Sequence, residues 1–485
     1  MGKGGMLTDN FETHANRFLD HTLAPKDRLQ LASEIRESIE IVQTSEYGNF
    51  LQHFIRAFNT YLRGTSNEGS PYFVQPADRF NTESPSYKTR SVLLEILNRV
   101  PTTEVLKPHA GDLLKLCMHV LDTDDEDNAV IALRIILELH KQYRSPRPTQ
   151  GAPQMPGPLE GDVQPFLDFV CKVYQNFPTT LKEAFERPAQ GQARPAVRKS
   201  TQSFKVVTEC PLIVMFLFQL YESYAQPNVQ TLLPLMVRAI NLAAPQSVRQ
   251  TPQFASLYVD FIASQVKTLS FLTYLLRGSA EWVRPHGAII PRSVVQLLVS
   301  CPHDSLQVRK ELLVATRHIL ATDFREGFYE HVDVFLNERL LVGTSRGAGD
   351  SLRPLAYSLL AEVVHHVRMK LNMQQLSKAV HLFSRNVHDA SLPLNVQTTS
   401  IRLLMNLVEG IYHKHNTEQD QAKAGAASVM NHGAESHVQG RKLLVRILDT
   451  FVRKFGTLKE YTKKLCAARK KDKLDDSSLL LEFMP

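Results

Sequence analysis

Apolar residues recur every three or four positions in several long windows of the chain. Leu31, Ile35 and Ile39 share one face of a helix, because an α-helix completes a turn in 3.6 residues. Residues 127–143 repeat this spacing. Acidic residues at 124–127 stand at the start of that window, where a helix dipole and free backbone N–H groups favour carboxylates. These windows predict amphipathic helices.

A repeat of 44 residues is the strongest organisational signal. Segments that begin with a polar residue followed by Val or Leu start at positions 307, 351 and 395. Periods of about 40–47 residues are typical of HEAT and armadillo arrays, in which neighbouring helix pairs stack because one pair cannot cover its own apolar face. The chain is therefore predicted to be an all-α, HEAT/armadillo-like helical-repeat solenoid. Chance recurrence among amphipathic helices is the alternative. Corresponding apolar pairs are Ile319-Leu320, Val363-Val364 and Leu407-Val408.

Breaks in the periodic pattern suggest how the chain is divided. The segment 145–165 holds six prolines and has no apolar period, as expected for a flexible linker. The expected order is N-terminal helical repeats at 1–144, the Pro-rich linker at 145–165, HEAT-like repeats at 166–413 with a polar insert at 187–203, a mobile linker at 414–440, and a basic helical segment and tail at 441–485.

Positive charge is concentrated at one end of the chain. The net charge is +7, whereas residues 441–473 alone carry twelve Lys/Arg and three Asp/Glu. The remainder is slightly acidic, so we expect no direct nucleic-acid binding along the chain. For the basic end we favour a solvated helix face, with Tyr461, Leu465 and Ala468 on the buried side. A nuclear localisation signal or nucleic-acid patch is the alternative.

Neither a membrane anchor nor a disulfide framework is expected. The longest apolar run, Pro211 to Tyr221, is shorter than the roughly 20 residues that span a bilayer. The five cysteines are far apart and include no CxxC pair, which indicates free thiols, mostly buried.

No motif in the sequence supports catalysis. Residues 343–347 match G-x-S-x-G, but a nucleophile elbow follows a β-strand, whereas the preceding residues resemble a helix end. An inter-helix loop is the favoured interpretation. His365-His366 and His413-x-His415 lack metal-ligand spacing, since adjacent helical residues point in different directions. We expect no enzyme activity, no cofactor and no metal.

Seven long strings of the chain carry a resemblance to a known family. They are NRVPTTEVLKPHAGDLL (98–114), NAVIALRIILELHKQYR (128–144), FLDFVCKVYQNFP (166–178), YVDFIASQVKTLSFLTYLLR (258–277), SCPHDSLQVRKELLVATRHILATDFREGF (300–328), LRPLAYSLLAEVVHHVR (352–368) and LPLNVQTTSIRLLMNLVEGI (392–411). These strings resemble the N-terminal HEAT region of the TRRAP family. The similarity runs in order from about residue 29 to about residue 464. It implies a very large protein with HEAT repeats, a FAT region and a phosphatidylinositol-3-kinase-like domain without catalytic residues. This chain ends at Pro485, so we expect it to be a fragment or a truncated gene model.

The resemblance implies a nuclear scaffold of SAGA-type and nucleosome histone acetyltransferase complexes. Its partners would be other subunits of those complexes and acidic transcription activators, which it would recruit to promoters. An importin-like transport receptor is disfavoured, because Trp282 is the single tryptophan. The HEAT array of an active phosphatidylinositol-3-kinase-related kinase is disfavoured only by the string resemblance. Basic residues on the repeat helices are the expected contacts for acidic segments: Arg309, Lys310, Arg317, Arg353, Arg368 and Lys370.

Overall fold

The computed structural model describes residues 11–64, 70, 72, 79–143, 157–185, 198–249, 251–278, 280–343, 348–423 and 430–472. Throughout these ranges the regular elements are helices, and the extended pairing consists of one isolated antiparallel bridge, Asp125 to Lys199. The predicted all-α class is confirmed. The chain divides into two compact units, Met1–Val283 (unit 1) and Arg284–Pro485 (unit 2).

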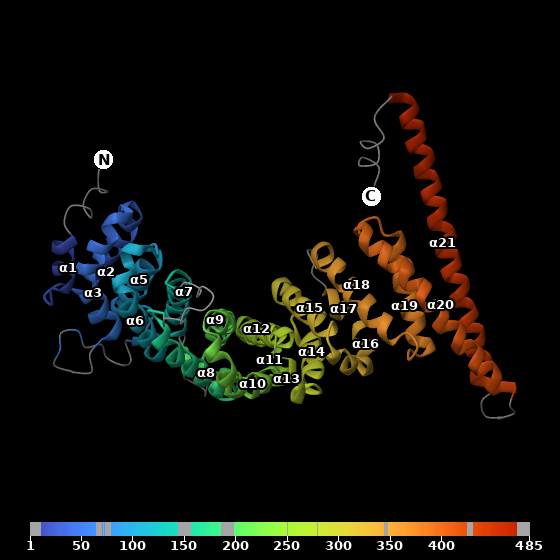
Figure 1. Ribbon diagram of the computed structural model, residues 1–485, viewed down its shortest axis with the longest axis horizontal. Helices are drawn as coiled ribbons and strands as arrows, with labels where there is room; N and C mark the ends of the chain where they lie inside the picture. Colours follow the sequence, from blue (N-terminus) through green and yellow to red (C-terminus); the bar gives the residue numbers. More distant parts are fainter. Residues whose placement is uncertain are drawn as a thin grey trace, which may run out of the picture. The chain divides into compact units, whose positions relative to one another are not determined.

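Unit 1 is a succession of helices, each packed mainly on helices one to three positions away in the sequence, as α9 packs on α12 (Figure 1). Short 3-10 or π turns join many of them, for example the π-helix Asn59–Arg63 and the 3-10 turn Ser200–Gln202 (η6). The α-helices are α1 (Phe11–Leu19), α2 (Pro25–Ser38), α3 (Tyr47–Phe58), α5 (Pro85–Arg99), α6 (Ala110–Thr123), α7 (Glu126–Gln142), α8 (Val163–Phe185), α9 (Phe204–Leu220), α10 (Ala225–Ile240), α11 (Gln246–Arg249), α12 (Ala255–Gly278) and α13 (Ala280–Val283).

Aromatic side chains from α8, α9 and α12 form part of the core of unit 1. Phe177, Phe204 and Phe261 are each at most 1% exposed, and their ring centroids lie 5.3 to 5.9 Å apart. Rings at these distances gain favourable edge and offset contacts in addition to apolar burial. Three helices distant in sequence are thereby held together.

Unit 2 has the same construction from a second set of helices (Figure 1). A nine-residue 3-10 segment, Asp323–His331 (η10), connects two of them. The α-helices are α14 (Ile289–Ser300), α15 (Leu306–Leu320), α16 (Val332–Phe335), α17 (Glu338–Val342), α18 (Ala348–Val367), α19 (Met373–His388), α20 (Leu394–Lys423) and α21 (Met430–Asp472).

The 44-residue period corresponds to equivalent helices of unit 2. The three repeat starts fall at or near the beginnings of α15, α18 and α20, and α18 packs against both of the others. A Cβ atom added at Gly410 would lie 3.1 Å from the Arg368 carbonyl oxygen, so this position of α20 approaches the chain just after α18 closely. The apolar pairs are buried, except that Val408 is 37% exposed.

The helix limits differ from the predicted segment limits in two places. α20 continues to Lys423 and α21 begins at Met430, so helices occupy much of the range 414–440 that was predicted as a linker. The end of the predicted insert 187–203 is packed, because Ser200 and Ser203 are buried. Of the G-x-S-x-G match, residues 344–347 lie outside the described part of the chain, and α17 rather than a strand precedes it.

Of the described helices, none is by itself both long and apolar enough to cross a membrane, although the bent pair Phe204–Leu220 and Glu222–Ile240 passes that test when taken together. The cysteines are free, and all except Cys466 are buried. Burial raises the pKa of Cys117 to about 12 and that of Cys171 and Cys301 to about 11. These thiols therefore stay protonated and unreactive at neutral pH.

Candidate functional site

Arg309 of α15 is fully buried and cannot act as a surface contact. Its exposed fraction is 0%. The guanidinium donates hydrogen bonds to the carbonyl oxygen of Cys301 at 2.6 Å, to that of Pro302 at 3.3 Å, and to that of Leu340. Burial lowers the pKa of Arg309 from its ordinary value. The predicted docking role of this residue is wrong, since its side chain joins α15 to the end of α14 and to α17.

Lys310 and Arg317 lie on the exposed side of the same helix. They are seven residues apart, which places them on one face about 10 Å from each other along the helix axis. Val314, between them, is 38% exposed. This face of α15 presents two cations around an accessible apolar side chain.

Arg353 of α18 is engaged in an ion-pair cluster. Its Nη2 atom lies 2.5 Å from Asp389 Oδ2, and its guanidinium lies 5.7 Å from the centre of the Tyr357 ring. The Tyr357 hydroxyl donates to Glu338, which also accepts from Arg385 at 2.7 Å. The cluster links α17, α18 and α19, so the charge of Arg353 is already compensated within the chain.

Arg368 and Lys370 follow the end of α18 and differ in exposure. Arg368 is half-buried and donates from Nη1 to the His365 carbonyl oxygen at 2.7 Å. A cation in this position complements the negative end of the helix dipole. Lys370 is exposed, with its Nζ atom 5.2 Å from the centre of the Tyr329 ring. Lys370 is therefore the more accessible of the two cations.

The predicted contact residues do not form one compact site. Arg353 and Arg368 are separated by fifteen residues, which is about 22 Å along a helix. The exposed members of the set are Lys310 and Arg317 on α15 and Lys370 after α18. An extended partner can contact all three cations, whereas a single carboxylate cannot.

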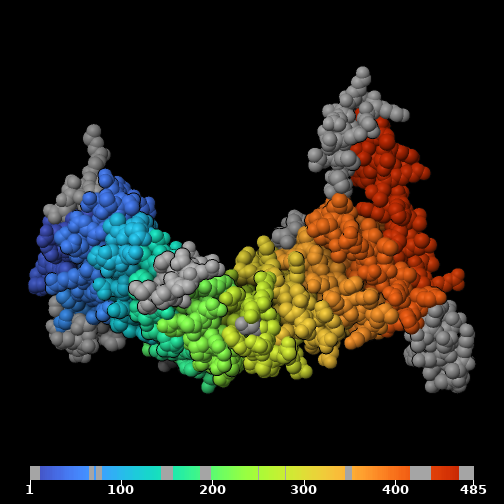
Figure 2. All heavy atoms as spheres, viewed as in Figure 1, coloured from blue at the N-terminus to red at the C-terminus, as the bar shows by residue number. Residues whose placement is uncertain are grey.

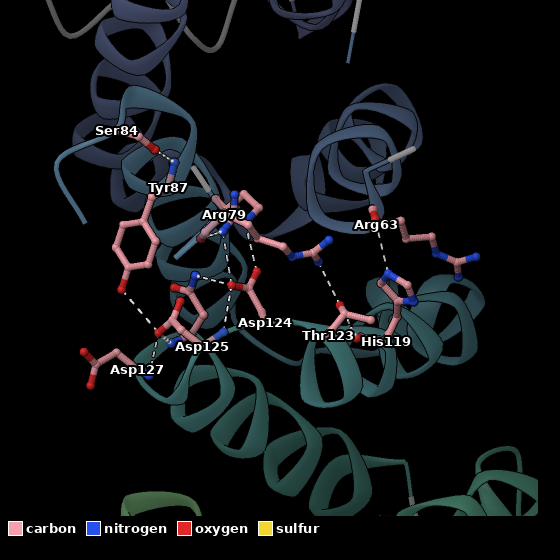
Figure 3. A network of polar contacts seen from close by, with 11 residues as sticks. Arg63, Arg79, Ser84, Tyr87, His119, Thr123, Asp124, Asp125 and Asp127 are labelled. Atoms are coloured by element: carbon pink, nitrogen blue, oxygen red, sulfur yellow. Dashed lines mark hydrogen bonds and ion pairs between the residues drawn. The ribbon is translucent and has the colours of Figure 1, made fainter. Parts of the chain in front are cut away.

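Unit 1 contains a buried polar network that sequence reasoning did not predict (Figure 3). Arg90 of α5 forms two hydrogen bonds with Asp124, from Nε at 2.9 Å and from Nη2 at 3.2 Å, and also donates to the Arg79 carbonyl oxygen at 2.6 Å. Arg90 is 3% exposed and Asp124 is fully buried. The pair fixes α5 against the turn between α6 and α7.

Asp125 is the N-cap of α7, as the acidic run in the sequence suggested. Its Oδ1 atom accepts from the backbone N–H groups of Asp127 at 2.8 Å and Asn128 at 3.1 Å, and from the Tyr87 hydroxyl at 3.2 Å (Figure 3). Its Oδ2 atom is buried without a hydrogen-bond partner. Burial, reinforced by the neighbouring Asp124 carboxylate, raises the pKa of Asp125 to about 7.

The segment after residue 197 completes this network. Ser200 donates from its backbone N–H to the Asp124 carbonyl oxygen at 3.1 Å, and the Glu126 N–H donates to the Arg198 carbonyl oxygen at 2.8 Å. Ser203 caps α9 and its hydroxyl donates to Glu126 Oε2 at 2.7 Å. The network joins four elements of unit 1 through buried side chains, so it stabilises the packing of these elements.

A shallow hollow lies between the ends of α9 and α12. Its volume is about 740 Å³, and its lining combines Phe218, Tyr274 and Trp282 with polar groups, of which Glu222 is the one charged residue. In the described residues no group of three or more His, Cys, Asp or Glu side chains could hold a metal ion.

Comparisons with known proteins agree with the repeat architecture. Residues 257–479 match the family model described as the Tra1 HEAT repeat central region. The chain is 33% identical, over 96% of its length, to the probable transcription-associated protein 1 of Dictyostelium discoideum. It is 35% identical over 90% of its length to the human transformation/transcription domain-associated protein. It is 26% identical over 99% of its length to the SAGA complex/NuA4 acetyltransferase complex subunit TRA1 of Saccharomyces cerevisiae.

The chain spans only 11% to 14% of the length of these relatives. The match nevertheless extends over nearly all of this chain, in unit 1 as well as in unit 2. The chain belongs to the Tra1/TRRAP family and represents part of its HEAT-repeat region.

Proposed function

We propose that this chain is a scaffold segment, without catalytic activity of its own, of a nuclear histone acetyltransferase complex of the SAGA or NuA4 type. The observation that carries this proposal is the near full-length similarity to relatives named as subunits of both complexes, in Saccharomyces cerevisiae and, at 31% identity over 82% of this chain, in Schizosaccharomyces pombe. Stacked helical repeats suit this role, because they present long surfaces to several partners at once.

The proposal includes docking of acidic transcription activators on unit 2. Its support is the exposed basic set of Lys310, Arg317 and Lys370, with accessible Val314 between the first two. Acidic activators are disordered segments that fold on binding, which makes their affinity modest for the area buried. Binding between exposed charges should also weaken as salt concentration rises.

A charge-reversal titration tests the docking part of the proposal. The triple variant Lys310→Glu, Arg317→Glu and Lys370→Glu should lower the affinity for a fluorescent acidic activation-domain peptide by about tenfold or more. The matched control reverses three exposed cations of unit 1, Lys115→Glu, Arg134→Glu and Arg238→Glu, with the same change in net charge. Equal affinity of the two triple variants would remove this residue assignment.

A further inference from the structure

Large apolar side chains remain exposed along the last described helix, α21. This helix has 43 residues, from Met430 to Asp472, and its C-terminal part, red in Figure 2, rises clear of the neighbouring repeats of unit 2. Exposed apolar patches of this kind mark interaction surfaces. The side chains, between 39% and 69% exposed, are Val438, Val445, Leu448, Val452, Phe455, Leu458 and Tyr461.

One face of α21 is already occupied by the rest of unit 2. Leu443, Ile447 and Thr450 are buried, because α21 packs on α19 and α20. Farther along the same face, Lys454 Nζ donates to Gln397 Oε1 of α20 at 2.8 Å. This face therefore needs no further partner over these residues.

Four of the exposed apolar residues lie on a different face. Val445, Leu448, Val452 and Phe455 follow one another at intervals of three, four and three residues, the spacing of a coiled-coil seam. At 100° per residue, the centre of this stripe lies roughly 150° around the helix from the buried face. The stripe is thus nearly opposite the packed face rather than at its margin.

The exposed stripe is long enough for a partner helix. With Val438, which lies one heptad before Val445, it covers about 25 Å of helix length, and Arg441 lies on the same line between these two valines. Beyond Phe455 the same line of positions continues with Lys459 and Lys463, so the apolar stripe ends where cations begin. A partner helix of four to five turns would cover it.

The charges on α21 select the kind of partner. Residues 438–464 carry eight Lys/Arg and two Asp/Glu. Arg441, Lys459 and Lys463 lie on or close to the line of the stripe. Arg446 and Arg453 lie roughly 120–140° around the helix from its centre, and Arg453 is paired within the helix to Asp449 at 3.0 Å. A second copy of this helix would bring like charges together, which is unfavourable. A helix with acidic flanks would instead meet complementary charge.

We propose that the stripe from Val438 to Phe455 on α21 is a docking face for an amphipathic helix of a partner protein. That helix would carry an apolar seam of three- and four-residue spacing between acidic flanks. The inference rests on the docking role proposed above but assigns it to a separate surface, distant in sequence from Lys310 and Arg317. The two assignments can therefore fail independently.

A designed peptide tests the proposal on the full chain. The probe is a fluorescent helix of about four heptads, with Leu on the seam and Glu on the flanks, compared with a scrambled peptide of the same composition. We expect saturable binding of the designed peptide only. The variant Leu448→Glu with Phe455→Glu should weaken it by about tenfold or more. Leu212→Glu, at a 52% exposed position of α9, should leave it unchanged.

Each other outcome overturns the proposal in a recognisable way. Equal binding of the scrambled peptide would mean unspecific charge attraction. Circular dichroism has to show that the double variant is folded before its weaker binding is attributed to the stripe. A dimer in light scattering that disappears in the double variant would assign the stripe to a second copy. A longer chain can be tested that also carries the following repeats of a full-length relative. Loss of peptide binding in that chain would show that the next repeat packs on the stripe. The variant Lys310→Glu with Arg317→Glu should not alter this binding, which separates it from the docking site on α15.

Discussion

Arg90 in unit 1 and Arg309 in unit 2 are both buried arginines, but they are neutralised by different groups. Arg90 forms an ion pair with Asp124 through two hydrogen bonds, and a second buried acidic residue, Asp125, follows Asp124. Arg309 meets three backbone carbonyl oxygens and no carboxylate. In the first case a buried carboxylate supplies the opposite charge, and in the second the peptide dipoles stabilise the cation. The two sites should therefore respond differently to mutation and to pH.

The single tryptophan allows the two units to be followed separately. Trp282 belongs to unit 1, whereas circular dichroism reports the helices of both. A variant that destabilises unit 1 should shift both signals, and one that destabilises unit 2 should shift circular dichroism alone.

The largest effect is expected for Arg90→Met. It would leave the buried Asp124 carboxylate without the cation that forms hydrogen bonds with it, a situation that costs about 3–5 kcal/mol. The Trp282 transition in chemical denaturation should move to lower denaturant concentration at pH 7, and the loss should shrink at about pH 4, where carboxylates begin to take up protons. A loss that is independent of pH would contradict the ion-pair account.

Arg309→Met should destabilise unit 2 by about 3 kcal/mol, because carbonyl oxygens now bonded to the guanidinium would be buried without donors. The measurement is a shift in the circular dichroism transition without a shift in Trp282 fluorescence. Arg309→Lys should recover part of the loss, since it keeps the charge but provides fewer donors. A variant as stable as the wild type would show that these hydrogen bonds do not hold α15 in place.

Asp125→Asn should stabilise unit 1 at neutral and higher pH by about 2 kcal/mol. The folded state raises the pKa of Asp125 to about 7 from 3.8, so it binds a proton more tightly than the unfolded state does. The contribution of this proton to stability is present at low pH and is lost as the pH rises from about 4 through 7. Asn keeps the capping oxygen and removes that dependence. Identical pH profiles of the two proteins would refute the raised pKa of Asp125.

The smallest effect is expected at the exposed cation next to Arg309. Lys310→Ala should change stability by no more than about 0.5 kcal/mol, as is usual for surface substitutions. Comparison of this variant with Arg309→Met shows whether burial causes the difference in stability loss between the two adjacent basic residues. A loss at Lys310 as large as that at Arg309 would indicate a contact that its exposure does not suggest.

The sequence predicted the helices and their repetition but not which charges are buried. Helical periodicity and the 44-residue period are local signals, and α15, α18 and α20 bear them out. The burial of Arg309 had a signal as well, because it stands three and four residues before Leu312 and Leu313, on the apolar stripe of α15. The prediction treated it as a surface cation because basic residues are usually exposed.

Two other features depend on contacts that the sequence does not contain. The acidic run at 124–127 indicated a helix start, and Asp125 is the cap of α7, but the pairing of Asp124 with Arg90 joins residues 34 positions apart. Tyr461 was expected on a buried face of the basic helix and is 39% exposed. The prediction that Tyr461 is buried is wrong, because periodicity places a residue on one face of a helix but does not show whether another helix covers that face.

Purification of the tagged chain from nuclear extract, followed by mass spectrometry, tests the central claim most directly. The account predicts recovery of SAGA- or NuA4-type acetyltransferase subunits with the wild-type chain, and the same recovery with Lys115→Glu as a surface control. Recovery of none of these subunits, from a sample that circular dichroism shows to be helical, would contradict the proposal that this segment is a scaffold of such a complex.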